Sequence, residues 1–182
     1  ALPLYISGNE TTDDTRRGDV QGDGRTFPDS SFGIWEASTN LINNGSFDSN
    51  TSGWSAFNSS TLNRVTFNKK FGLASMQIKT AGAGANEGAT FTGSVTAGQT
   101  YVFSAFLLGD NNASISLQCF DSVTTFTSPV YLLDSSNWQR VSFKFTSGAT
   151  SSAAKFRIIT NGSTQAIYIY VDGVQLENKV IA

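Results

Sequence analysis

The sequence predicts an all-β fold, a two-sheet antiparallel jelly-roll β-sandwich with an extended N-terminal arm. Short runs in which apolar and polar residues alternate recur along the chain, and Gly, Asn, Ser and Thr separate them. No segment sustains the apolar period of about 3.6 residues that a helical layer needs. Only 14% of the residues are charged, whereas 14 residues are Phe, which is typical of a packed domain with polar turns.

The first part of the chain has a different character. Residues 8–28 read GNETTDDTRRGDVQGDGRTFP and contain almost nothing apolar. Such a segment buries too little apolar area to offset its ordering entropy. We therefore predict an extended arm over residues 1–38, which contacts a neighbouring subunit or scaffold, and a folded domain over residues 39–182.

Within the domain, strand signals recur at a spacing typical of sandwiches and jelly rolls. In residues 141–145, VSFKF, the odd positions are apolar and the even positions are polar. One face of that strand is therefore expected to pack in the core and the other to face solvent. Residues 101–108 are apolar at nearly every position, which suits a central strand covered on both sides. The expected strands are 64–67, 74–80, 88–95, 101–108, 113–121, 130–133, 138–146, 153–160 and 166–176.

The last expected strand changes its inward parity. Ile169 and Val171 share one face, but the next apolar residues are Val174 and Leu176. A switch from odd to even positions requires one extra residue, so we predict a β-bulge at Asp172 and the following Gly. The predicted core contains Phe47, Trp54, Phe103, Val141, Phe143, Phe145, Phe156, Ile158, Ile169 and Val171, and the single cysteine, Cys119, is expected to be a buried small hydrophobe.

Two stretches bracket the domain, NLINNGSFDSNTSGW at residues 40–54 and YIYVDGVQLE at residues 168–177. Their pattern, N-L-x-x-N-x-x-F-[ED], then G-W, then V-D-x-V-Q-L-E, resembles the jelly-roll carbohydrate-binding modules of families 4, 9 and 22. The resemblance covers residues 40–177 and implies that the first and last strands meet. Such modules also occur as accessory domains of phage virion proteins and bacterial surface proteins, and residues 32–54 look like the lead-in found in phage structural proteins.

The composition argues against several classes of function. The chain has no histidine, the commonest general base and metal ligand. A glycosidase needs two carboxylates across a cleft, but the acids of the domain fall mostly in turns and at strand ends, so an enzyme is not expected. The net charge is −2 and the basic residues are scattered, so nucleic acid binding is not expected. No apolar run is long enough to span a bilayer, so a membrane span is not expected either.

The resemblance also implies a structural calcium ion, because these modules often carry one where the first and last strands meet. The matching side chains are Asp48, where the family more often has Glu, and Asp172, with backbone carbonyls around Lys69 and Lys70 completing the oxygen shell. The alternative is that the two aspartates cap turns without a metal.

A sugar-binding surface is the functional prediction. Tyr168 and Tyr170 alternate with the apolar residues of the last strand, and Gln118 and Phe120 alternate with those of strand 113–121. If these two strands share the concave sheet, they form, together with Arg157, an aromatic and polar platform for a polysaccharide or cell-surface glycan. Alternatively, the aromatic pairs only stabilise a sheet or become buried against a neighbouring subunit, as in a homo-oligomer.

Three hypotheses follow. The first is a non-catalytic glycan-binding domain at a virion surface, as capsid decoration or tail, or in an extracellular protein. The second is a purely structural virion accessory protein that keeps the fold without binding sugar. The third, a catalytic glycosidase domain, lacks an evident acid pair.

Overall fold

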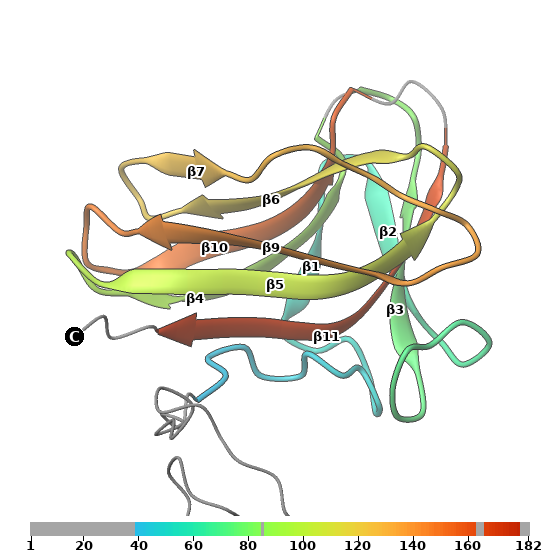
Figure 1. Ribbon diagram of the computed structural model, residues 1–182, viewed down its shortest axis with the longest axis horizontal. Helices are drawn as coiled ribbons and strands as arrows, with labels where there is room; N and C mark the ends of the chain where they lie inside the picture. The colour runs from blue at the N-terminus through green and yellow to red at the C-terminus, as the bar shows by residue number, and fades with distance from the viewer. Residues whose placement is uncertain (1–38, 85, 163–165, 179–182) are drawn as a thin grey trace, which may run out of the picture. The chain divides into compact units, whose positions relative to one another are not determined.

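The computed structural model describes residues 39–84, 86–162 and 166–178. This part of the chain forms eleven strands (Figure 1). The strands are β1 (Trp54–Phe57), β2 (Ser60–Val65), β3 (Ser75–Thr80), β4 (Gly88–Val95), β5 (Thr100–Gly109), β6 (Ser114–Phe120), β7 (Thr125–Thr127), β8 (Tyr131–Leu132), β9 (Gln139–Thr146), β10 (Ser151–Thr160) and β11 (Tyr168–Asn178).

The strands form two antiparallel sheets, which confirms the predicted sandwich. One sheet has the order β1-β4-β10-β6-β7, with β8 also paired to β6, and is called the β10 sheet. The other has the order β2-β3-β11-β5-β9 and is called the β11 sheet. Their inner faces meet in the core, where the ring of Phe103 on β5 lies 5.6 Å from that of Phe156 on β10.

The core forms largely from the residues that alternation predicted. Cys119 has no exposed surface, and burial raises the pKa of its thiol to about 12, so it behaves as a small hydrophobe. Phe143 is only partly buried but packs against the core. The other predicted core residues are all buried, namely Phe47, Trp54, Phe103, Val141, Phe145, Phe156, Ile158, Ile169 and Val171.

The two bracketing stretches meet as predicted. Asn40 forms an antiparallel bridge with Glu177. Its side-chain Oδ1 accepts hydrogen bonds from the backbone N–H of Ile42 at 3.0 Å and of Leu176 at 2.9 Å, and its Nδ2 donates to the carbonyl of Val174 at 2.9 Å. One asparagine therefore ties the start of the domain to its last strand.

The predicted bulge in β11 is also present. The register of β11 against β5 shifts between Asp172 and Gln175. Gly173 has φ of 55°, a left-handed conformation that favours glycine. The shift lets Val171 and Val174 both face the core.

Most strand boundaries differ from the prediction by one or two residues, and the larger differences are at β1, β2 and β7. β2 is Ser60–Val65, earlier than the expected 64–67, and Phe67 lies beyond it with 69% of its surface exposed. The short strands β1 and β7 were not expected, because WSAF and TFT are too short to show an alternating pattern. β5 does lie centrally between β11 and β9, but its outer face is only partly covered.

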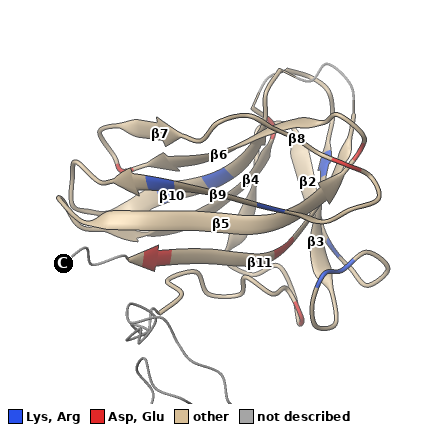
Figure 2. Ribbon diagram, in the orientation of Figure 1, with Lys and Arg blue, Asp and Glu red and all other residues tan. Residues whose placement is uncertain are grey.

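The predicted arm, residues 1–38, lies outside the described residues. Within the described ranges no helix that could cross a membrane occurs. Figure 2 shows the charged residues scattered over strands and loops. The basic residues Lys155 and Arg157 belong to β10.

Candidate functional site

A row of polar side chains crosses the outer face of the β10 sheet. Antiparallel register places Ser55 of β1 beside Thr90 of β4, Thr90 beside Arg157 of β10, Arg157 beside Gln118 of β6, and Gln118 beside Thr127 of β7. Paired residues in adjacent strands point to the same side of a sheet. Because the residues on either side of Arg157 and of Gln118 are buried in the core, the row faces outward.

Arg157 lies at the centre of this row between two aromatic rings. Its guanidinium carbon lies 4.5 Å from the ring centroid of Phe57 and 6.0 Å from that of Phe120, both within cation–π range. Its Nη1 donates a hydrogen bond to Oε1 of Gln118 at 3.1 Å. The guanidinium is therefore held in a defined position, and burial lowers its pKa.

Neighbouring side chains extend the polar surface. The Nε2 of Gln118 donates to Oγ1 of Thr127 at 3.3 Å, and Nζ of Lys155 donates to Oγ1 of Thr92 at 2.9 Å. Lys155 is also the register partner of Phe120. Rings and hydrogen-bonding groups thus alternate over one face, whereas none of these residues is a carboxylate that could act as the acid or base of a glycosidase.

Two polar atoms beneath this surface lack partners. The Nε of Arg157 and the Oγ1 of Thr90, which are adjacent in the register, are buried without a hydrogen bond to any described residue. An unpaired buried polar group costs free energy, and in such places the missing partner is often a ligand or a water molecule.

The structure separates the predicted sugar platform into two parts. Gln118, Phe120 and Arg157 lie together on the β10 sheet, but Tyr168 and Tyr170 belong to β11 in the other sheet. The premise that strands β6 and β11 share a sheet is therefore wrong. Alternation assigns a residue to a face, but it carries no information about which sheet a strand joins.

The tyrosines instead form part of the outer face of the β11 sheet. The hydroxyl of Tyr170 accepts a hydrogen bond from Nε2 of Gln77 at 3.2 Å, and its ring meets that of Phe67 edge-on at 5.9 Å. The ring centroid of Tyr168 lies 5.8 Å from Nζ of Lys79. These contacts support the sheet-stabilising alternative for both tyrosines.

Comparison with known sequences and structures identifies the family. The profile of a family described as a carbohydrate binding domain, CBM_4_9, matches residues 39–165. The chain belongs to this carbohydrate-binding domain family. A comparison with curated proteins finds no match.

Solved structures similar to this carbohydrate-binding domain have the same fold. The CBM22-1 xylan-binding domain of Paenibacillus barcinonensis Xyn10C is 15% identical with a TM-score of 0.63, covering 82% of this chain and 100% of that chain. A CBM4 structure is 17% identical with a TM-score of 0.58, and the match covers 74% of this chain and 100% of that chain. The CBM22-1–GH10 modules of Clostridium thermocellum Xyn10B, complexed with xylohexaose, are 18% identical with a TM-score of 0.62. That match covers 78% of this chain and 29% of that chain.

The expected calcium ligands of this carbohydrate-binding domain meet at one loop, residues 68–73. Oδ2 of Asp172 accepts hydrogen bonds from the backbone N–H of Lys70 and of Phe71, each at 2.8 Å, and Oδ1 of Asp48 accepts one from Leu73. Burial raises the pKa of Asp172 more than these hydrogen bonds lower it, and the nearby Asp48 charge raises it further. The two aspartates are thus close, but the loop directs amide hydrogens at them.

This arrangement does not fit the calcium shell that the resemblance implies. Calcium needs six to eight oxygen ligands, which is why carbonyls of Lys69 and Lys70 were expected to complete the shell. The N–H of Lys70 faces Asp172 instead, as a turn-capping aspartate requires. The aspartates therefore hold the loop by accepting hydrogen bonds from it.

We expect the melting temperature of the domain to stay unchanged when EDTA and then calcium are added. The reason is that backbone N–H groups already satisfy both carboxylates. Differential scanning calorimetry measures this, with magnesium as the matched control ion. A rise in melting temperature with calcium but not with magnesium would show that the loop turns its carbonyls toward a bound ion.

The structure adds residues that sequence reasoning missed. Phe57 contacts Arg157, and Thr90 and Thr127 complete the row. Only the strand register brings them together, so no local sequence signal identifies them. The aromatic residue Phe57 in WSAFNSS was the one local sign of this site, but β1 is too short to show on which face Phe57 lies.

Proposed function

We propose that the outer face of the β10 sheet binds a glycan chain without catalysis. The residues that carry the binding are Phe57, Gln118, Phe120 and Arg157, which we call the glycan face. The observation that supports this most is the guanidinium of Arg157, held between two aromatic rings and hydrogen-bonded to Gln118. The family of the chain supports the same ligand class.

The chemistry of the glycan face suits a sugar ring. A pyranose has an apolar C–H face that packs on an aromatic ring, and hydroxyl groups that need oriented partners. Phe120 is partly exposed and offers the ring, while Arg157 and Gln118 offer donors at the same level of the sheet. A guanidinium that is already fixed loses little conformational entropy when it binds, so the affinity gained per hydrogen bond is larger.

Replacing Arg157 with Gln, or Phe120 with Ala, is expected to weaken glycan binding at least about tenfold, because each removes a main contact. A glycan array identifies the ligand, and titration calorimetry with that oligosaccharide measures the change. Xylan oligosaccharides are the first probes, since similar structures include a xylan-binding domain.

The matched control is the variant with both Tyr168→Ala and Tyr170→Ala on the other sheet. We expect it to bind as the unmodified chain does. Melting temperatures of all variants establish that each is folded. Unchanged affinity in both Arg157→Gln and Phe120→Ala, with loss of affinity in the tyrosine variant, would move the site to the β11 sheet.

The setting that we propose is a virion surface, as capsid decoration or tail, or an extracellular protein. Residues 1–38 would attach the domain to a neighbouring virion or scaffold subunit, and the protein would form a homo-oligomer. The support is the sequence resemblance of residues 32–54 to phage structural proteins. Neighbouring genes distinguish the two settings, because capsid and tail genes indicate a virion and polysaccharide-degrading genes indicate a secreted protein.

A purely structural role is the second candidate. Its support is a pair of exposed apolar residues at β8, where Val130 and Leu132 are 55% and 57% exposed. Single exposed apolar residues are common, whereas neighbouring ones are more typical of protein contacts. A silent glycan array together with burial of these residues in the assembly would favour this role.

A further inference from the structure

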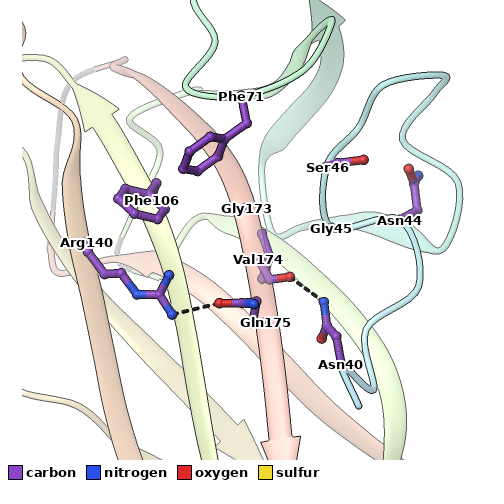
Figure 3. Close-up of a pocket in the computed structure, with 10 residues that line it drawn as sticks. All are labelled: Asn40, Asn44, Gly45, Ser46, Phe71, Phe106, Arg140, Gly173, Val174 and Gln175. Atoms are coloured by element: carbon purple, nitrogen blue, oxygen red, sulfur yellow. Dashed lines mark hydrogen bonds between the residues drawn. The ribbon is translucent and has the colours of Figure 1, made fainter. Parts of the chain in front are cut away.

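A pocket of about 430 Å³ lies on the other side of the domain, between the loop that begins at Asn40 and the outer face of the β11 sheet (Figure 3). A volume of this order is ordinary for a small-ligand site. Strands β5, β9 and β11 and loop 68–73 all contribute to its walls. The lining residues are Asn40, Asn44, Gly45, Ser46, Phe71, Phe106, Arg140, Gly173, Val174 and Gln175.

Arg140 is fixed at one side of this pocket. Its Nη2 donates to Oγ of Ser104 at 2.8 Å and to Oε1 of Gln175 at 2.7 Å, and Figure 3 shows the second bond. Its guanidinium carbon lies 5.1 Å from the ring centroid of Phe106. The side chain is therefore held by two neutral acceptors and one ring, with no carboxylate among these partners.

The held guanidinium keeps unused donors. The N–H bonds on Nη1 and Nε of Arg140 have no partner among the residues that the structure describes, nor does the Nε2 amide of Gln175. The two side chains that carry these donors lie next to each other in the pocket lining, because Arg140 and Gln175 are directly hydrogen-bonded. An N–H on Nη1 of Arg140 and one on Nε2 of Gln175 can each donate to one oxygen of the same carboxylate.

The charge of the pocket also favours an anionic ligand. None of its lining residues is acidic, and a second cation is close, since Nζ of Lys70 lies 5.5 Å from the ring centroid of Phe106. The rings of Phe71 and Phe106 meet edge-on at 5.1 Å, and Phe71 is 49% exposed, so an aromatic surface borders the cationic side.

We propose that this pocket is a second binding site, for a sugar unit that bears a carboxylate, such as a uronic acid residue in an acidic polysaccharide. The carboxylate accepts hydrogen bonds from Arg140 and Gln175, and the sugar ring packs against Phe71. The pocket and the glycan face lie on opposite sheets, so this site does not depend on the function proposed for the glycan face.

The test uses the full chain and three tetrasaccharides in titration calorimetry. These are a galacturonic acid tetramer, the same tetramer with methyl-esterified carboxylates, and a neutral xylose tetramer. We expect the acidic tetramer to bind and its ester to bind at least about tenfold more weakly, because esterification removes the charge while it keeps the rings. Equal affinity for acid and ester would overturn the proposal.

Substitutions at two cations of the same strand separate a site from general attraction. Arg140→Gln should lose at least about tenfold in affinity for the acidic tetramer. Lys144→Gln removes the same charge from the same face of β9 and should change the affinity by less than about twofold, as expected for an exposed and distant cation. Equal losses in both variants would show non-specific attraction and contradict the proposal.

A spectroscopic readout locates the ligand independently of affinity. On adding the acidic tetramer, the side-chain amide of Gln175 and the backbone amide of Gly173 should shift in a nitrogen–proton correlation spectrum. Arg157→Gln should leave these shifts unchanged, because Arg157 lies on the opposite sheet. Shifts confined to the β10 sheet would place the acidic tetramer on the glycan face and refute the second site.

Discussion

Replacing Phe156 with alanine is expected to lower the free energy of unfolding by about 3 to 5 kcal/mol, the usual cost of removing a fully buried phenylalanine. Phe156 has no exposed surface, and its ring lies 5.6 Å from that of Phe103 and 6.4 Å from that of Phe145. Both partners come from the opposite sheet. The substitution therefore leaves a cavity between the two sheets, where neither sheet can close without shifting the other.

Urea denaturation measures this loss, and Phe67→Ala is the matched control. Phe67 is 69% exposed, so its truncation should change stability by less than about 1 kcal/mol. Because Arg157 follows Phe156 directly on β10, the variant also tests how far the glycan face depends on the core beneath it. A loss below about 1 kcal/mol for Phe156→Ala would mean that the sheets do not meet at this ring.

The fold could be predicted from the sequence where side-chain alternation is long and its faces differ. Residues 141–145 alternate cleanly, and the parity change after Val171 located a bulge that the register shift confirms. The short strands β1 and β7 were not predicted because each has few side chains, and at least half of these are exposed. Their place in the sheet depends on partners distant in sequence, which no local pattern reports.

The bracketing motif was predictive because its residues have structural causes. A Cβ on Gly45 would lie 2.2 Å from the carbonyl oxygen of Val174, so only glycine lets the first loop approach β11 this closely. Asn44 adopts φ of 61°, and its Nδ2 donates to the carbonyls of Asn50 and Ser52 at 2.9 and 3.0 Å. Closure of the domain could therefore be read from the sequence.

The site was predicted only in part because a binding face is a property of the sheet. Gln118, Phe120 and Arg157 were found from their outward positions, and the structure does bring them together. Tyr170 was grouped with them by the same reasoning but lies in the other sheet. In a jelly roll, consecutive strands often alternate between sheets, so outward alternation in two strands does not place them side by side.

Asp121 links the turn between β6 and β7 to the turn between β9 and β10, which joins the two sheets. Asp121→Asn is therefore expected to lower the free energy of unfolding by about 2 to 3 kcal/mol. Its Oδ1 accepts hydrogen bonds from the N–H of Val123 at 3.0 Å and of Thr124 at 2.7 Å. Its Oδ2 accepts from the N–H of Gly148 at 2.9 Å and from Oγ of Ser147 at 3.0 Å. The carboxylate has no exposed surface, so an amide nitrogen placed there would face donors without an acceptor.

The same carboxylate should make stability depend on acid. Burial raises the pKa of Asp121, but the hydrogen bonds from Thr124, Val123, Gly148 and Ser147 lower it more, to about 2, below its ordinary value of 3.8. A group whose pKa is lower in the folded state stabilises the fold above its unfolded pKa and loses that effect as the pH falls toward the folded pKa. The stability gap between the unmodified chain and Asp121→Asn should therefore be constant near neutral pH and narrow between about pH 4 and pH 2.

Urea denaturation of both proteins across this range measures the gap, and Asp134→Asn is the matched control. The pKa of Asp134 is also lowered, by hydrogen bonds from the side chain of Asn137 and the N–H of Ser136. These bonds are solvent-exposed, so Asp134→Asn should change the stability much less than Asp121→Asn does. Because Phe120 immediately precedes Asp121, loss of the two linked turns should also weaken glycan binding while the domain is still folded. A gap that stays constant down to pH 2 would show that folding does not lower the pKa of Asp121, and its hydrogen bonds would then not favour the charged carboxylate.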